Sequence, residues 1–109
     1  MDRSSLLRLL GDPTRAAILE ALVANERAVA DLVELTGDEQ SNVSHHLRHL
    51  REAGLVVARR HGRRQLYRFT DPEVGRLLGE LVATASRLEQ ACYTARLGIP
   101  ADAGFHGYG

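Results

Sequence analysis

The sequence predicts a mainly helical α+β fold, with about five helices and one small β-hairpin in a single domain. Three observations predict it. Apolar residues recur at helical spacing in several segments, two β-prone runs flank a Gly-containing turn, and 109 residues suffice for one hydrophobic core. With 44% hydrophobic and 26% charged residues, the composition is typical of a globular domain. We expect this domain to cover residues 1–97 and a flexible, glycine-rich tail to cover residues 98–109.

Two helices are expected at the start of the chain. Ser4 or Ser5 is a candidate N-cap for the first, which would end near residue 10. Asp12 and Pro13 suit the N-cap and first position of the second, because an aspartate accepts from free backbone N–H groups and proline needs no donor there. Asn25 marks the end of this second helix.

Two further helices joined by a glycine turn are expected next. The third helix covers residues 29–35 and stops before Gly37, which can adopt a positive φ. The fourth finds N-cap candidates within residues 38–41, runs from Asn42 to Ala53 and is closed by a glycine. Its apolar residues fall at i, i+4 and i+7 and form one stripe: Val43, Leu47 and Leu50. One face of this helix therefore packs and the other is polar.

A β-hairpin and a long helix complete the pattern. Residues 55–58 and 65–69 are β-prone, and His61-Gly62 is a candidate tight turn at a tip that carries four arginines. Asp71 or the preceding threonine would cap the last helix, with Pro72 in its first position. Its apolar stripe is wide for a helix exposed to water: Val74, Leu77, Leu78, Leu81, Val82, Ala85 and Leu88.

The net charge is zero, but the charges are segregated along the chain. Residues 12–39 hold seven acids and two arginines, whereas residues 40–68 hold seven arginines and one acid. The chain has no lysine, and the guanidinium of arginine binds phosphate and guanine edges in a bidentate manner. Arginine usage also fits a GC-rich genome, so the segregation is the more informative feature. It would present a polyanion with a locally positive surface.

These parts, in this order, are those of a winged helix-turn-helix that binds double-stranded DNA. Residues 40–51 would enter the major groove, where Gln40 pairs with adenine and the neighbouring serines and His45 donate to bases or phosphates. The arginines of this helix and of the hairpin tip would meet the backbone and make affinity salt-sensitive. The expected DNA-contacting residues are Gln40, Ser41, Asn42, Ser44, His45, Arg48, His49, Arg51, Arg63 and Arg64.

Three segments resemble the ArsR/SmtB family of bacterial winged-helix repressors: GDPTRAAILEAL (11–22), QSNVSHHLRHLREAGLV (40–56) and RRHGRRQLYRF (59–69). The resemblance covers about residues 4–90. It implies a repressor that binds a palindromic operator as a homodimer, with DNA contacts near the start of the fourth helix. It also implies dimerisation through the first and last helices, which the wide apolar stripe supports independently. The expected interface residues are Leu6, Leu7, Leu77, Leu78, Leu81, Val82 and Leu88.

The resemblance also implies that a metal could be the effector, but most of the family's usual ligand positions do not match. The thiolate positions before Asp31 are alanines, which disfavours soft metals there. On the last helix only Asp71 and Glu73 could bind a metal, and Asp71 is equally well explained as an N-cap. Nickel or zinc fits the remaining nitrogen and oxygen candidates better. These are His45 and His49, one helical turn apart, and His106 in the tail.

The sequence also bears on functions other than DNA binding. No phosphate-binding glycine loop or His-Glu-x-x-His run is present, so we expect no enzyme. A winged-helix module that acts with a partner protein, or a regulator with a non-metal effector, stays open. Cys92 is expected to be a small core or interface residue, with a thiol signal as the alternative. Without a long apolar run or a cleavable leader, a cytoplasmic protein without a membrane segment is expected.

Overall fold

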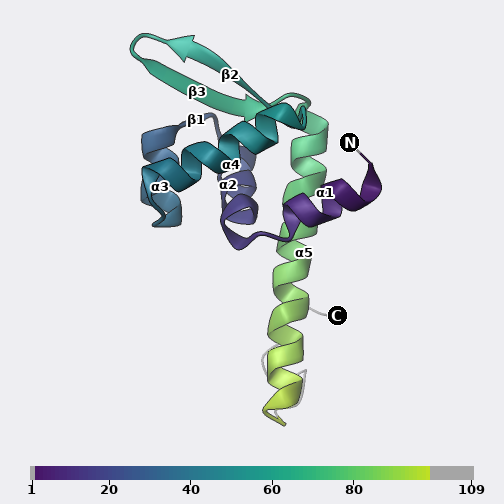
Figure 1. Ribbon diagram of the computed structural model, residues 1–109. Coiled ribbons are helices and arrows are strands. Elements are labelled where there is room, and N and C mark those ends of the chain that lie inside the picture. The colour runs from purple at the N-terminus through teal and green to yellow at the C-terminus, as the bar shows by residue number, and fades with distance from the viewer. Residues whose placement is uncertain (1, 99–109) are drawn as a thin grey trace. The chain divides into compact units, whose positions relative to one another are not determined.

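The computed structural model describes residues 2–98 and confirms a mainly helical α+β fold (Figure 1). The helices are α1 (Arg3–Leu10), α2 (Pro13–Ala24), α3 (Val29–Thr36), α4 (Gln40–Glu52) and α5 (Pro72–Arg96). The strands are β1 (Arg27–Ala28), β2 (Val56–His61) and β3 (Arg64–Phe69). The chain divides into two compact units, residues 1–79 and 80–109, and α5 has residues in both. The tail expected at residues 98–109 lies, from residue 99 onward, outside the described residues.

Aspartates cap the first two helices. At α1 the carboxylate of Asp2 accepts a hydrogen bond of 2.8 Å from the N–H of Ser5, so the prediction that Ser4 or Ser5 is the cap was wrong. At α2 the Oδ1 of Asp12 accepts from the N–H of Arg15 at 3.0 Å, as predicted, and a proline follows in the first turn. Each helix start is thereby fixed by its own sequence.

The segment from α3 to α4 forms the helix-turn-helix. Gly37 closes α3 with φ +73°, and its N–H donates to the carbonyl of Val33 at 2.9 Å. The next helix, α4, begins at Gln40, two residues before the start expected at Asn42. Its N-cap residue, Glu39, makes no side-chain capping bond. The polar start of α4 is therefore helical from its first expected DNA-reading residue.

The sheet has three strands in the order β1-β3-β2, one more than the two-stranded hairpin that was expected. The extra strand is only two residues long, and it pairs Arg27 with Tyr67 and Ala28 with Leu66 in antiparallel register. The turn between β2 and β3 consists of Gly62 and residue 63, not His61-Gly62, because the residue before Gly62 still pairs within the ladder. Of these two turn residues, Gly62 alone has a positive φ, +64°, the pattern of a type II′ turn.

Strand alternation gives the hairpin two faces. The core-side face carries the residues at even positions of β2 with their partners: Val56, Ala58, Arg60, Gln65, Tyr67 and Phe69. The outer face carries Val57, Arg59, His61, Arg64, Leu66 and Arg68. At the base of the hairpin the core-side face is buried, whereas Arg60 and Gln65 near the tip are exposed.

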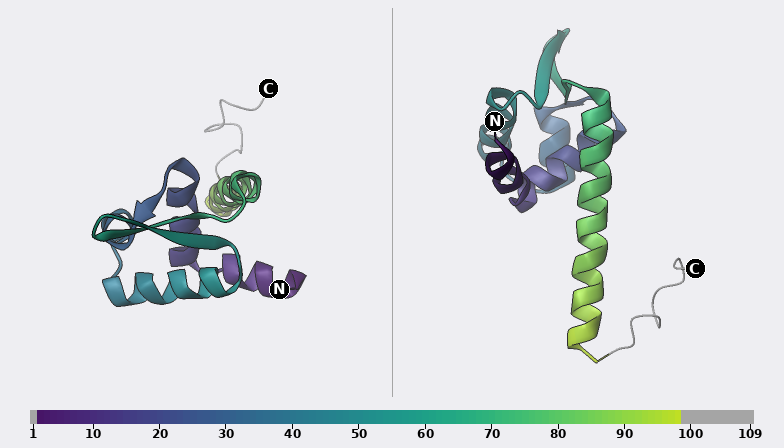
Figure 2. Two further views of the ribbon diagram at one scale, coloured as in Figure 1. Left: turned by 90° about the horizontal axis from the view of Figure 1, so that it is seen from above. Right: turned by 90° about the vertical axis from the view of Figure 1, so that its right-hand side faces the viewer.

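One hydrophobic core joins α2, α3, α4 and the base of the hairpin. Its fully buried members are Ile18, Leu19, Leu32, Val43, Leu47, Leu50 and Val56. Burying a side chain of this size contributes about 1.5–3 kcal/mol, so these contacts hold the helix-turn-helix against the sheet. The hairpin lies above α4 in Figure 1, and the view from above shows α4 running beside it (Figure 2, left). The core thereby orients α4 and the hairpin together.

The start of α5 packs closely on this core. A Cβ at Gly75 would lie 2.3 Å from Cδ2 of Phe69, so the helix and the aromatic ring approach each other where only glycine fits. Leu78 is also buried in this core. Across residues 2–98, no helix combines the length and apolarity needed to cross a bilayer.

Candidate nucleic-acid interface

The helix α4 separates an apolar side from a polar side. Val43, Leu47 and Leu50 are fully buried on the first side. The polar side chains recur at three- and four-residue intervals, which places them along one exposed stripe: Gln40, Ser41, Ser44, His45, Arg48 and Arg51. Amide, hydroxyl, imidazole and guanidinium groups can all hydrogen-bond to base edges or phosphates, so this stripe has the chemistry of a DNA-reading surface.

Asn42, which is expected among the DNA contacts, has a hydrogen-bond partner within the chain. Its Nδ2 donates to Oδ2 of Asp38, and the same oxygen accepts from the hydroxyl of Thr14 at 3.1 Å. The pKa of Asp38 is lowered, first by the N–H of Glu39 and then by the Asn42 bond. Asn42 therefore joins the turn before α4 to the start of α2 and is half-buried.

The two adjacent histidines of α4 point to different environments. His46 is buried, and its Nε2 lies 3.7 Å from Oδ1 of Asp12. His46 therefore lies on the packed side of α4, whereas its neighbour His45 is exposed. The position of His46 three residues after Val43 and four before Leu50 was the available signal, because that spacing continues the apolar stripe.

His45 lies within a small basic cluster. Its ring centroid is 4.3 Å from that of half-buried His49, and its Nδ1 lies 3.1 Å from Nη2 of Arg48. The pKa of His45 is lowered, chiefly by the nearby charge of His49, with smaller contributions from burial and Arg48. In the free protein at neutral pH, His45 is therefore an uncharged imidazole that can both donate and accept.

Some of the hairpin arginines form ion pairs with acids from other elements. Arg59 makes a two-bond ion pair with Glu26, with both N–O distances 2.7 Å. Nη2 of Arg64, an expected DNA contact, lies 2.6 Å from Oδ2 of Asp31. The acidic and basic segments of the sequence thus meet across the sheet, which sequence segregation alone did not reveal.

Two of the metal candidates already have protein partners. Oδ1 of Asp71 accepts from the N–H of Glu73 at 2.9 Å, which supports the N-cap interpretation. The carboxylate of Glu73 accepts two bonds from Arg76, at 3.1 and 2.6 Å. Among residues 2–98, no three His, Cys, Asp or Glu side chains gather closely enough to hold an ion. His45 and His49 are thus only two neighbouring candidate ligands, and His106 lies outside the described residues.

Several expected interface residues are exposed within one chain. Leu7 on α1 and Leu77, Leu81 and Leu88 on α5 expose 47–67% of their surface, while Leu6 and Val82 are half-buried. Leu78 differs, because it is buried in the core of its own chain.

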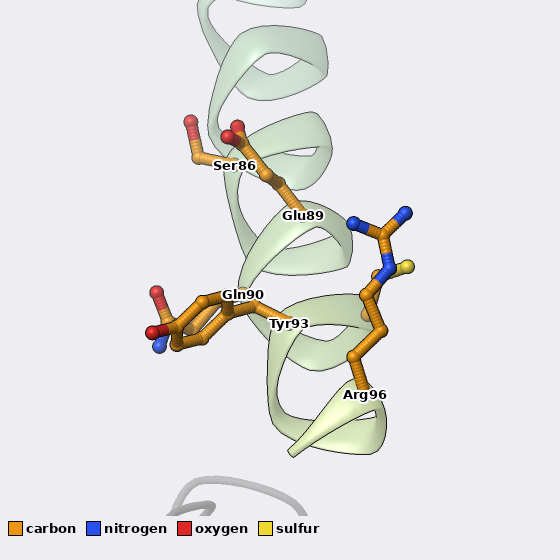
Figure 3. Close-up of a pocket in the computed structure, with 6 residues that line it drawn as sticks. Ser86, Glu89, Gln90, Tyr93 and Arg96 are labelled. Atoms are coloured by element: carbon orange, nitrogen blue, oxygen red, sulfur yellow. The ribbon is translucent and has the colours of Figure 1, made fainter.

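Cys92 is exposed, so it is not a core residue of the single chain, and a place in an interface stays a prediction. It lines a pocket along α5 with five polar or aromatic neighbours, which Figure 3 labels: Ser86, Glu89, Gln90, Tyr93 and Arg96. The hydroxyl, carboxylate and amide groups there are all exposed, so the pocket is a surface depression rather than an enclosed site.

Known proteins are similar to this chain in sequence and in fold. The family model described as bacterial regulatory protein, arsR family, matches residues 12–57. The transcriptional regulator NmtR of Mycobacterium tuberculosis is 44% identical over 85 residues, 78% of this chain and 71% of NmtR. The structure of CmtR, a cadmium metal-sensor from Mycobacterium tuberculosis, has a TM-score of 0.63 and 46% identity, covering 72% of this chain and 82% of CmtR. A homodimeric winged helix-turn-helix domain from Mycobacterium bovis has a TM-score of 0.66 and 33% identity, covering 83% and 91%.

Proposed function

Because the chain belongs to the arsR family of bacterial regulatory proteins, a family of winged-helix transcriptional regulators rather than enzymes, we propose that it is a homodimeric repressor. Its operator would be palindromic, since a two-fold dimer presents two copies of α4 to two half-sites. One observation carries the proposal. The stripe of polar side chains on α4 is exposed while the opposite side of the same helix is fully buried.

Within that stripe, Gln40, Ser41 and Ser44 are assigned to base edges, and Arg48 and Arg51 to phosphates. Gln40 lies in the first turn of α4, and in recognition helices the first residues reach the bases. The arginines lie further along the same exposed side, where they can follow the DNA backbone.

The experiment is a fluorescence-anisotropy titration of DNA from the region upstream of the chain's own gene, against a scrambled duplex of the same length. Gln40→Ala is expected to weaken binding to the operator about 5- to 150-fold for each half-site contacted, the effect of about 1–3 kcal/mol for one base contact. It should leave binding to the scrambled duplex unchanged. Glu20→Ala, on the exposed side of α2, is the control. Equal affinity of the wild type for both duplexes, without salt dependence, would instead favour a module that binds a partner protein.

A response to nickel or zinc is a second proposal, and it rests on the 4.3 Å separation of the His45 and His49 rings. Imidazole nitrogens suit both metals, and CmtR, a relative, is described as a cadmium sensor. The two rings would have to be completed by ligands outside this pair. Calorimetric titration with each metal, for wild type and His49→Ala, tests it. Binding that is lost in the variant and changes DNA affinity supports a metal effector, whereas no binding supports a non-metal signal.

A further inference from the structure

Two acids from outside the β2–β3 hairpin form ion pairs with arginines on its outer face. Glu26, which precedes β1, holds Arg59, and Asp31 in the first turn of α3 holds Arg64. Glu26 also feels the charges of Arg68 and His61, which belong to the same face. Its pKa is lowered chiefly by the hydrogen bond from Arg59. Glu26 and Asp31 therefore compensate most of the positive charge of this face, which carries Arg59, Arg64 and Arg68.

The core-side face has the opposite character near the tip. Arg60 lies there opposite Gln65 in the antiparallel register, and Arg63 occupies the turn. Within residues 2–98, neither arginine takes part in an ion pair. Both are exposed. Near the tip of the hairpin, the positive charge without an acid partner is thus concentrated at these two positions, whereas Arg68 lies at its base.

The core-side face is also the face directed toward α4. At the hairpin base, Val56 and Tyr67 share one core with Leu50 of α4, and α4 contacts β2. Arg60 lies four residues after Val56 on β2. Because every second side chain of a strand points to the same face, the Arg60 side chain leaves the hairpin on the same side as Val56. DNA that lies against α4 would meet this side near the tip of the hairpin.

We propose that the two faces of the hairpin have different tasks. Arg60 and Arg63 contact DNA phosphates, while Arg59 and Arg64 anchor the hairpin to β1 and α3 through Glu26 and Asp31. The proposal rests on the DNA-binding function above, and it replaces the expectation that Arg64 binds DNA. It names the acids as positioning residues of the hairpin.

Charge balance explains the division. An arginine that leaves a carboxylate for a phosphate exchanges one charge-assisted pair for another, so little is gained. The abandoned carboxylate would then repel the phosphate nearby. An arginine without an acid partner pays neither penalty, and its contact releases a counterion from the DNA.

The test compares Arg60→Gln with Arg64→Gln. Both variants remove one positive charge, keep a polar side chain and lie on neighbouring strands near the tip. The probe is a mixed-sequence duplex of about 30 base pairs, because phosphate contacts do not depend on sequence. Affinity is measured between about 50 and 200 mM salt, and circular dichroism confirms that both variants fold.

Arg60→Gln is expected to reduce the slope of log affinity against log salt by about 0.9 for each chain that contacts the duplex. Arg64→Gln should leave this slope unchanged and accelerate amide hydrogen exchange in β3, since it loosens the contact with Asp31. A reduced slope for Arg64→Gln, an equal reduction for both variants, or no reduction for Arg60→Gln would overturn the proposal. Absence of salt-dependent binding by the wild type would instead overturn the DNA-binding function itself.

Discussion

A single carboxylate oxygen links the start of α2 to the buried side of α4. Oδ1 of Asp12 accepts the N–H of Arg15 at 3.0 Å and lies 3.7 Å from Nε2 of His46. The cap of one helix is thereby also a contact of the helix proposed to bind DNA. Changes at this oxygen should affect both helices.

Two replacements of Asp12 should therefore distinguish its role as the N-cap acceptor from the role of its negative charge. Asp12→Ala is expected to lower the free energy of unfolding by about 0.5–2 kcal/mol, because it removes the N-cap acceptor. Asp12→Asn keeps an acceptor and should cost less than the alanine variant. Urea denaturation followed by circular dichroism measures both. Equal losses for the two variants would show that capping is not what this residue contributes.

Stability should also decline in acid in a manner that depends on Asp12. Its pKa is lowered from the ordinary value of 3.8, first by the backbone N–H of Arg15, with the charge of His46 adding to the effect. A lowered folded-state pKa gives stability that is present above pH 3.8 and is lost as the pH falls through the lower value. The acid-induced decline should be smaller in Asp12→Asn. Glu34→Gln, at an exposed position on α3, should follow the wild-type curve.

Gly75→Ala should destabilise the protein although alanine favours helices. The new Cβ would meet Phe69 at 2.3 Å, so the ring or the helix must move. Such overpacking costs about 1–3 kcal/mol, which exceeds the gain of about 1 kcal/mol in helix propensity over most of that range. At Gly79 the obstacle is a methyl group of Val23 at 2.7 Å, and Gly79→Ala should cost less. Thermal unfolding of both variants checks this order, and an increase in Tm for Gly75→Ala would contradict it.

DNA affinity should rise as the pH falls from about 7.5 to 6. The pKa of His45 is lowered in the free protein by His49, Arg48, His46 and Arg15, so the ring is neutral there at pH 7.5. Nearby phosphates favour the protonated ring, so binding should take up a proton and strengthen in mild acid. His45→Asn should flatten this pH dependence of the anisotropy titration. An unchanged profile in this variant would remove His45 from the phosphate contacts.

Leu81→Glu should convert the proposed dimer to a monomer. Leu81 exposes 47% of its surface in one chain, and a charge placed in an apolar interface is costly. Ala83→Glu adds the same charge two residues away, on another side of α5, and is the control. Sedimentation velocity should show a smaller species for the first variant alone. Dimers of both variants would exclude this stripe from the interface.

The sequence predicted those parts of the fold that depend on neighbouring residues. Asp12 as a cap and Gly37 as a helix terminator follow from chemistry within three or four positions. The strand β1 was missed because two residues carry no period, and its pairing with Tyr67 depends on a segment about 40 residues away. The serine cap of α1 was wrong because Asp2, one turn earlier, was a competing acceptor of the same type.

The sequence predicted the exposed stripe of the candidate site, but it did not predict the intrachain partners of the site's side chains. The polar stripe of α4 was visible in the helical period, but the local role of Asn42 depends on Asp38 and Thr14. The pairing of Arg64 with Asp31 spans 33 residues, and no local pattern could specify it. Sequence periodicity gives the face of a side chain, whereas its partner depends on tertiary packing.

The alternation of the hairpin also limits how its length can change. Along β2 the acid-paired Arg59 and the unpaired Arg60 occupy adjacent positions and therefore opposite faces. A single-residue insertion between Val57 and Arg59 would move every later side chain of β2 to the opposite face. Arg60 would then turn to the outer face, and Arg59 would turn away from Glu26. Insertions of two residues would keep each arginine on its present face. Relatives should therefore differ in the length of this hairpin strand by even numbers of residues.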